Sequence, residues 1–558
     1  MGFSKLVLAI YPAQEPIMKE PSPHTRALID RLSEPHTLWE KLTGSRKYAA
    51  IFSEIAGSNE PAAIVDLLPF VLATKLNIAT AAADAVHRLL RGFPAKELSW
   101  LEYNLRARVS YSGGVIYDWY KLSPSQLALL ERFGDQSVQI LGLASFHHNG
   151  YVREAAINRL ASSATGAELP FLILRLNDWV SNVRDAAYQA ILSRLKPEYC
   201  QRFIDNFALL SRVEKAGRAD HTQIIQAINE LLKSDQCRTV LRDALTSSDR
   251  FIRRACFRLA LDSTSLDLQQ VAMLALDDED TVIRYWGAPK ISSVSDVATR
   301  ERFLALMKRD GFMPVRREAL RIAVKHDLPD VVEELHTALL DQHKSMREEA
   351  RYQLKSIPSI AVAAFYREQL TRAAGPKLYA VISGLGETGR AEDDRLMLPY
   401  TSHPSSKTRR AAIKALASLR PEAHLELFMS ALEDDVPSIS QHALKALSRK
   451  TASLSAARVW ELFSSKAHAH VKRNALSLIG RFAKWESISY LIRAVCNIDE
   501  TIVELSRSAI RRWLIRFNRS FTTPTPEQLA RFKDALEQCG KLLDEATHEQ
   551  LSFSIKGY

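Results

Sequence analysis

The chain has 558 residues, which exceeds the size at which one hydrophobic core usually stops growing, so a single compact domain is not expected. Hydrophobic residues make up 46%, as in ordinary folded proteins, and only 20 glycines and 22 prolines favour helix over sheet. The net charge of +11 permits contact with nucleic acid or another acidic partner without establishing one.

The beginning of the chain and its cysteines bear on location. The segment MGFSKLVLAIYPAQ lacks the long apolar stretch and the small-residue cleavage site of a secretory signal. No stretch approaches the ~18 apolar residues of a membrane span, so no membrane contact is expected. The five cysteines are far apart and form no CxxC motif, which indicates a reducing compartment and argues against structural zinc. The cytoplasm is therefore the predicted location.

Residues 1–45 are predicted to be a loose N-terminal arm followed by a short helix, because five prolines interrupt them. Residues 46–140 read as degenerate helical repeats. Within them, 106–124 break the pattern, since Gly113-Gly114 lies among residues that favour strands, as in a small hairpin or protruding loop. Two interpretations remain open for the aromatic residues of this loop: they pack back onto the helices, or they bind a partner. The residues concerned are Tyr111, Tyr117, Trp119 and Tyr120.

A repeat recurs through residues 141–515. Each copy has an apolar or related anchor, usually a basic residue at the next position (+1), a small residue at +4 and often Leu or Ile at +8. Successive anchors are separated by 31 or 32 residues, apart from one interval of 62, which holds a further copy at Lys377, and one of 69, which holds an irregular repeat with extended helices. The anchors are Val152, Val183, Ile252, Ile283, Val315, Met346, Thr408, Ile439 and Val471.

This spacing predicts one apolar face on a helix, here called the B helix of each repeat. Asn149, Asp249 and Asp280 lie three residues before their anchors, where an N-cap accepts backbone N–H bonds. A second apolar segment, the A helix, precedes each B helix. One such hairpin cannot bury its apolar face alone, so stacking in an array is expected. Residues 516–558 contain Pro and then a helical pattern, which predicts a C-terminal capping helix and a tail.

The B-helix signature, aliphatic–Arg–x–x–Ala–x–x–x–Leu, resembles the HEAT-repeat family, and within it the short PBS-lyase-like bacterial type. The resemblance covers roughly residues 140–515. It implies an all-α fold, a HEAT-like α-solenoid in which antiparallel helix pairs form a right-handed superhelix. It also implies a general binding scaffold, since such arrays do not share one function.

Apparent catalytic motifs are better explained by the repeat. Gly384, Gly386 and Gly389 have G-x-G-x-x-G spacing, but they follow a predicted B helix, so we expect a C-cap and an inter-repeat turn. His468 and His470 do not share a helix face, and no metal site or cofactor is predicted.

Trp179 follows Asp178 before a B helix and is predicted to pack in an inter-helix turn. Some HEAT-like bacterial DNA glycosylases bind damaged nucleotides with these residue types, but no matching motif is present.

Basic residues give the better functional signal. Arginines at +1 are expected to form a structural ladder with acidic turn residues of the neighbouring repeat. Further basic residues would stack one repeat apart on the B-helix face and form a basic stripe suited to a phosphate backbone or an acidic protein. The stripe residues are Arg254, Arg317, Arg410, Arg473, Arg511 and Arg512.

The sequence thus predicts a non-enzymatic scaffold or adaptor that holds a protein partner on its concave face. The alternative is a DNA- or RNA-binding protein that uses the basic stripe. A PBS-lyase-type enzyme or chaperone ranks below both.

Overall fold

The computed structural model describes residues 20–33, 45–109, 117–355, 361–465 and 468–558. Within these ranges the secondary structure is helical and contains no strand. The chain divides into two compact units, Met1–Phe303 (unit 1) and Leu304–Tyr558 (unit 2), each with its own apolar core. The predicted four-part division of the chain stays a prediction.

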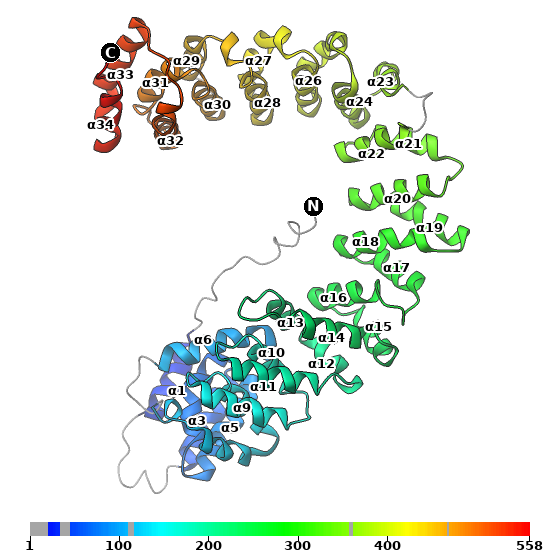
Figure 1. Cartoon of the computed structure of the whole chain (residues 1–558), viewed down its shortest axis with the longest axis vertical. Helices are drawn as coiled ribbons and strands as arrows, with labels where there is room; N and C mark the ends of the chain where they lie inside the picture. Colours follow the sequence, from blue (N-terminus) through cyan, green and yellow to red (C-terminus); the bar gives the residue numbers. More distant parts are fainter. Residues whose placement is uncertain (1–19, 34–44, 110–116, 356–360, 466–467) are drawn as a thin grey trace. The chain divides into compact units, whose positions relative to one another are not determined.

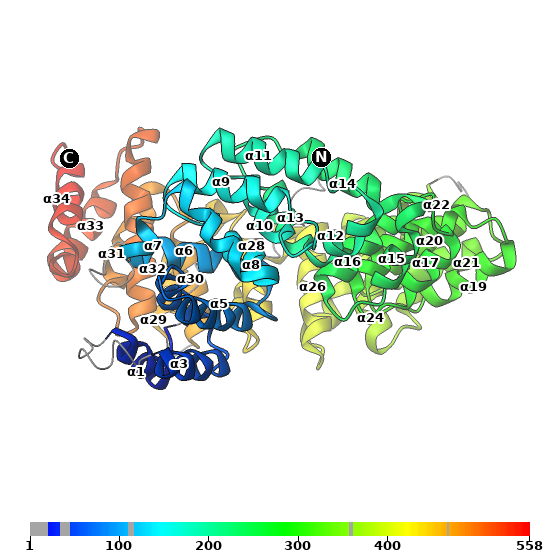
Figure 2. The same ribbon diagram turned by 90° about the horizontal axis from the view of Figure 1, so that it is seen from below.

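Unit 1 begins with helices that do not follow the regular repeat and continues with A and B helices in alternation. In the regular part, B helices α9 and α11 pack side by side, each on its own A helix (Figures 1 and 2). The early helices are α1 (Pro23–Ser33), α3 (Ser45–Gly57), α4 (Ile64–Val71), α5 (Leu76–Leu90), α6 (Leu98–Val109) and α7 (Tyr117–Tyr120). The A/B pairs are α8 (Ser137–Ala144) with α9 (Gly150–Ala161), α10 (Leu169–Arg175) with α11 (Ser181–Leu192), α15 (Arg238–Ala244) with α16 (Arg250–Ala260), and α17 (Leu268–Asp277) with α18 (Thr281–Gly287).

The long interval between α11 and α15 differs from its prediction. In place of extended helices, its first part forms two short ones, α12 (Cys200–Asp205) and α13 (Phe207–Glu214), which meet at Asn206. Asn206 leaves helical geometry at φ −104 and ψ 15, and this separates the two helices. The third helix, α14 (Thr222–Lys233), packs on α16 and so continues the array.

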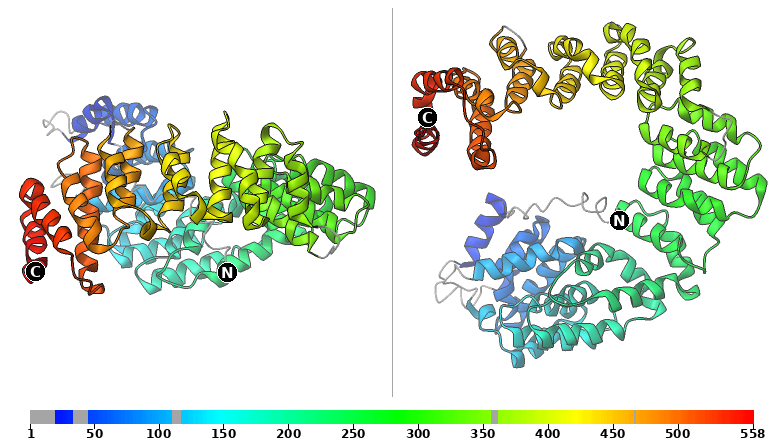
Figure 3. Two further views of the ribbon diagram at one scale, coloured as in Figure 1. Left: turned by 90° about the horizontal axis from the view of Figure 1, so that it is seen from above. Right: turned by 45° about the horizontal axis from the view of Figure 1, so that its top comes forward.

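Unit 2 continues the alternation after α19 (Val297–Met307), whose residues extend from unit 1 into unit 2. Figures 1 and 3 show B helices α26, α28, α30 and α32 following one another on one side of the array, with α27, α29 and α31 on the other. The helices are α20 (Met313–Lys325), α21 (Val331–Leu339), α22 (Lys344–Leu354), α23 (Val362–Leu370), α24 (Gly375–Thr388), α25 (Asp394–Met397), α26 (Ser406–Leu419), α27 (Leu425–Leu432), α28 (Pro437–Leu447), α29 (Ala456–Ser464), α30 (Ala469–Ile479), α31 (Lys484–Ala494) and α32 (Glu500–Arg516).

The repeat positions behave as their spacing predicts. Every anchor except Ile252, which is partly buried against the core, is buried, and so is every small residue at +4. The predicted N-caps are also confirmed: Asn149 accepts from the Tyr151 amide, Asp249 from the amides of Phe251 and Ile252, and Asp280 from that of Val282. Apolar burial between stacked helices, with capped helix starts, therefore holds the array together.

Two expectations about punctuation need correction. Gly389 is the C-cap of α24, but Gly384 and Gly386 lie inside the helix. A Cβ on Gly386 would lie 2.5 Å from the Ala415 Cβ, so this glycine lets α26 approach α24. The C-terminal cap comprises two helices, α33 (Pro526–Cys539) and α34 (Glu545–Ser554), where one helix and a tail were expected.

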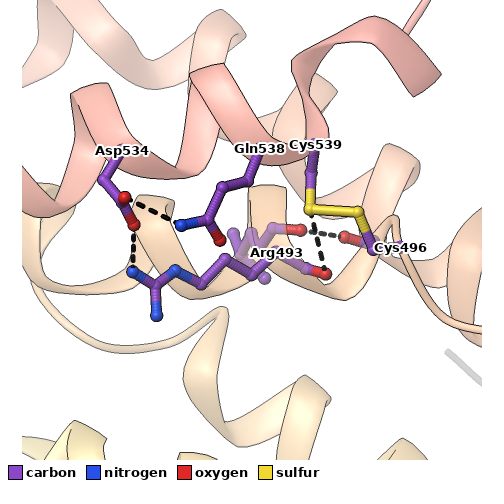
Figure 4. The surroundings of a disulfide bond; sticks show 7 residues. Arg493, Cys496, Asp534, Gln538 and Cys539 are labelled. Carbon is purple, nitrogen blue, oxygen red and sulfur yellow. Dashed lines mark hydrogen bonds and ion pairs between the residues drawn. A yellow bond between two sulfur atoms is a disulfide. The ribbon is translucent and has the colours of Figure 1, made fainter.

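Four of the five cysteines lie in pairs, which their spacing in the sequence did not indicate. Cys200 and Cys237 form a buried disulfide inside the irregular interval of unit 1. In unit 2, Cys496 and Cys539 join the residue that follows α31 by two positions to the end of α33 (Figure 4). The inference of a reducing compartment from scattered cysteines therefore loses its basis, and the cytoplasmic location stays a prediction. None of the helices in the described ranges is long and apolar enough to cross a membrane.

Candidate binding surfaces

The +1 arginines form the expected ladder. Four of them pair with an aspartate 25 residues later, at the turn of the following repeat. Each also donates to the backbone carbonyl six residues before it, inside its own turn. The four pairs are Arg153–Asp178, Arg253–Asp278, Arg316–Asp341 and Arg409–Asp434. These guanidinium groups fasten neighbouring turns together, so they are structural rather than partner-binding residues.

The aspartate of each pair is itself part of a turn. Asp178 accepts a bond from the Val180 amide at 3.0 Å, and Asp434 accepts one from the Val436 amide at 2.9 Å. Burial alone would raise the pKa of Asp178, but bonds from Arg153 and the Val180 amide outweigh it and hold that pKa below its usual range. Asp178 is therefore charged at neutral pH, as a ladder requires.

The predicted basic stripe is divided by its surroundings. In unit 1, Arg254 donates two hydrogen bonds to Asp280 at 2.6 and 2.9 Å and is nearly buried. Its role is therefore structural, like that of the +1 arginines. In unit 2, Arg317, Arg410 and Arg473 are partly exposed, and no carboxylate of the described residues lies within 4 Å of them.

The other unit 2 members of the stripe, Arg511 and Arg512, are exposed on α32. They too have no carboxylate within 4 Å among the residues described. The guanidinium groups of unit 2 are therefore available in a way that Arg254 is not.

Two members of a second basic row on unit 2, Arg449 and Arg481, escaped the sequence reasoning. Arg449 and Arg481 lie ten residues after the anchors Ile439 and Val471 of α28 and α30, and Arg512 of the stripe lies ten residues after Ile502 in the next B helix, α32. The three helices pack in that order. All three are exposed, and the described part of the chain places no acid within ion-pair distance. Their register, read at +10 as well as at +2, was the signal that could have revealed them.

The aromatic loop divides as well. Tyr111 lies outside the described residues, and Tyr117 begins α7. Trp119 is 3% exposed and belongs to the core, which matches the packing alternative for this residue. Tyr120 remains 44% exposed, with its ring stacked on that of His148 at 3.9 Å between centroids.

The prediction that Trp179 packs away in a turn is wrong. The residue is 69% exposed, although it does lie in the turn between α10 and α11. The guanidinium group of Arg218 stacks on its indole, 3.7 Å from the ring centroid. Tyr151, at the start of α9, is 75% exposed. Unit 1 thus displays aromatic and arginine side chains together, the residue types most enriched at protein interfaces.

Comparisons with known proteins agree with the repeat architecture. Residues 395–462, from α25 into α29, match the family model described as HEAT repeats, which confirms the resemblance for this stretch. The narrower PBS-lyase-like assignment stays a prediction. A search of curated proteins finds no match.

Solved α-solenoids are similar at low identity. Kap121p is 11% identical with a TM-score of 0.35, covering 95% of this chain and 67% of its own. Yeast importin-β (Kap95p) is 11% identical with a TM-score of 0.30, covering 95% and 94%. The S. pombe condensin Cnd3–Cnd2 subcomplex is 12% identical with a TM-score of 0.34, covering 91% and 76%. Similarity at this level carries no information about partners.

Proposed function

We propose that this HEAT-repeat solenoid is a non-enzymatic scaffold that binds an acidic protein partner on the B-helix face of unit 2. The observation that supports it is the contrast between two kinds of arginine on the same helices. Arg409 is engaged by the ladder, whereas its neighbour Arg410 has no acidic partner among the described residues. Unpaired guanidinium groups at repeated positions provide binding energy that the fold itself does not use.

A protein surface fits this face better than single-stranded nucleic acid does. Helices α26, α28 and α30 contain no Phe, Tyr or Trp, so bases would have no aromatic side chain of these helices on which to stack. Ile515, on α32 beyond Arg512, is 73% exposed and adds an apolar element next to the charges. Arginine combined with exposed apolar side chains is typical of protein interfaces.

The test is affinity purification of the native complex with a charge-reversed variant. We expect a stoichiometric protein partner to remain bound to the wild-type chain after nuclease treatment and to be lost from Arg410→Glu/Arg473→Glu. The control Arg395→Glu/Lys533→Glu changes the net charge by the same amount at two exposed residues, on α25 and α33. It should retain the partner.

A second measurement separates the alternative function. The +11 charge keeps a nucleic-acid-binding role open. Binding of labelled DNA and RNA should then weaken steeply with salt and disappear in Arg410→Glu/Arg473→Glu. If the purified complex dissociates on nuclease treatment and the chain binds DNA or RNA in this way, the nucleic-acid-binding function replaces the protein-scaffold proposal.

A further inference from the structure

Unit 1 contains a cleft of about 310 Å³ between α6, α10 and α13. Its walls combine aliphatic side chains with a concentration of arginine, and the exposed indole of Trp179 forms part of its edge. The lining residues on which the argument depends are Glu102, Arg175, Asp178, Trp179, Arg212 and Arg218.

Two arginines of the cleft are held in place without being neutralised. Arg218 lies on the Trp179 ring and donates to the backbone carbonyl of Asn177 at 3.1 Å, and its amide donates to the Asn177 side chain at 3.2 Å. Arg212 donates to the backbone carbonyl of Lys96 at 2.9 Å. No carboxylate in the described ranges lies within 4 Å of either guanidinium group. Their positions are therefore fixed while their charge remains available.

The acidic residues of the cleft cannot neutralise them. Asp178 is completely buried and receives Arg153 at 2.7 Å and Arg175 at 2.8 Å. Glu102 pairs with Arg106 at 2.7 Å and with Arg175. Even so, the buried Nε of Arg175 has no hydrogen-bond acceptor among the described residues. Both carboxylates of the cleft are thus already paired with other arginines, and one arginine nitrogen still lacks a hydrogen-bond acceptor. The site as a whole therefore favours an anion.

We infer that this cleft binds a carboxylate-bearing segment of a protein partner, an acidic peptide with an apolar residue beside the acid. The inference rests on the proposed scaffold function and assigns it a second contact site. The planar forks of Arg212 and Arg218 match carboxylate geometry. Leu174, Leu209 and Val213 line the cleft and suit the apolar residue. The volume lies at the small end of ligand sites, which suits one or two side chains.

The experiment measures binding of a short fluorescent peptide of alternating glutamate and leucine to the purified full-length chain, by anisotropy at low salt. The same peptide with glutamine in place of glutamate is the ligand control. We expect Arg218→Glu and Trp179→Ala each to weaken binding of the glutamate peptide by about tenfold or more. Arg238→Glu, an exposed arginine on α15 of the same unit, should change it less than about twofold. Circular dichroism of each variant confirms that the fold is intact.

Other outcomes would overturn the inference. Equal binding of the two peptides, or binding unaffected by Arg218→Glu, would show that the cleft does not select carboxylates. Binding of a labelled DNA oligonucleotide that the glutamate peptide does not displace, and that Arg218→Glu abolishes, would assign the cleft to a phosphate backbone instead. Because the scaffold proposal is tested with variants of unit 2, a partner that depends on Arg410 and Arg473 while the peptide fails to bind would refute this inference alone.

Discussion

The Arg153–Asp178 pair of unit 1 and the Arg409–Asp434 pair of unit 2 are built from the same sequence positions, yet their surroundings differ. Both span 25 residues, and both arginines donate to the carbonyl six residues earlier. The side chains of the first pair are 4% and 0% exposed, and those of the second 20% and 18%. The sequence motif thus determines the contact, while its energetic weight depends on what covers it.

In unit 1, further charged residues surround the Arg153–Asp178 pair. Arg175 also binds Asp178, and Glu102 joins Arg175 to Arg106. The Arg409–Asp434 pair lacks such a layer in the described residues and lies next to solvent. Desolvated pairs are costly to break because the remaining charge stays buried, whereas solvent-exposed pairs contribute little.

The largest expected effect separates these two pairs directly. Asp178→Asn should destabilise unit 1 by about 3–5 kcal/mol, since it leaves two buried guanidinium groups without their shared carboxylate. Asp434→Asn should cost unit 2 only about 1 kcal/mol or less. Urea unfolding with hydrogen exchange followed on peptides of each unit measures both. Equal costs would show that burial does not set the weight of the ladder.

The pH dependence of unit 1 should reflect the same burial. Burial next to His148 lowers the pKa of His147 to about 4, while its ring bonds to the Trp119 carbonyl at 2.9 Å. The unfolded chain takes up this proton first as the pH falls, so the stability contribution is complete above about pH 6.5 and is lost toward pH 4. The loss should reach up to about 3 kcal/mol.

Unfolding of unit 1 followed across this pH range checks the effect, and His147→Gln should flatten the profile. An unchanged profile in that variant would assign the acid sensitivity to other groups.

The two disulfides, one in each unit, should differ in how readily they are reduced. Cys200 and Cys237 are both buried, whereas Cys496 is exposed. Mild reductant should therefore open only the Cys496–Cys539 bond in the folded protein, and mass spectrometry after alkylation should find label at these two positions alone.

Loss of that crosslink should destabilise α33 by about 2–4 kcal/mol. Arg493–Asp534 then remains as a non-covalent link between α31 and α33 (Figure 4). Label at Cys200 under the same conditions would indicate that unit 1 opens more readily than its burial implies.

Much of the fold follows from periodicity. The anchors, the small residues at +4 and the caps at Asn149, Asp249 and Asp280 could be identified because helix geometry places them at fixed intervals. The +1 ladder was also foreseeable, since an aspartate stands 25 residues after four of these arginines.

The candidate surfaces were less accessible to sequence reasoning. Arg254 and Arg410 occupy the same register position, but only the first meets an acid, Asp280, in the next repeat. Trp179 is exposed, and Arg218, from the junction between α13 and α14, stacks on its ring. The disulfide pairs likewise depend on how the irregular interval and the cap fold back. Each of these features is an individual contact between segments 26 or more residues apart that does not recur from repeat to repeat, unlike the ladder.

The smallest expected effect concerns helix spacing in unit 2. Gly386→Ala gains up to about 1 kcal/mol of helix propensity, but the new Cβ would lie 2.5 Å from the Cβ and 2.7 Å from the Cα of Ala415. Backbone cannot move aside cheaply, so the overpacking cost of about 1–3 kcal/mol should exceed the gain and leave a net loss of up to about 2 kcal/mol. Thermal unfolding measures the change. Gly57→Ala, at the last residue of α3 in unit 1, is the control in a helix, because nothing lies within 4 Å of its Cβ. A stabilised Gly386→Ala would mean that α24 and α26 have room to separate, and that unit 2 is looser in its helix packing as well as in its ladder.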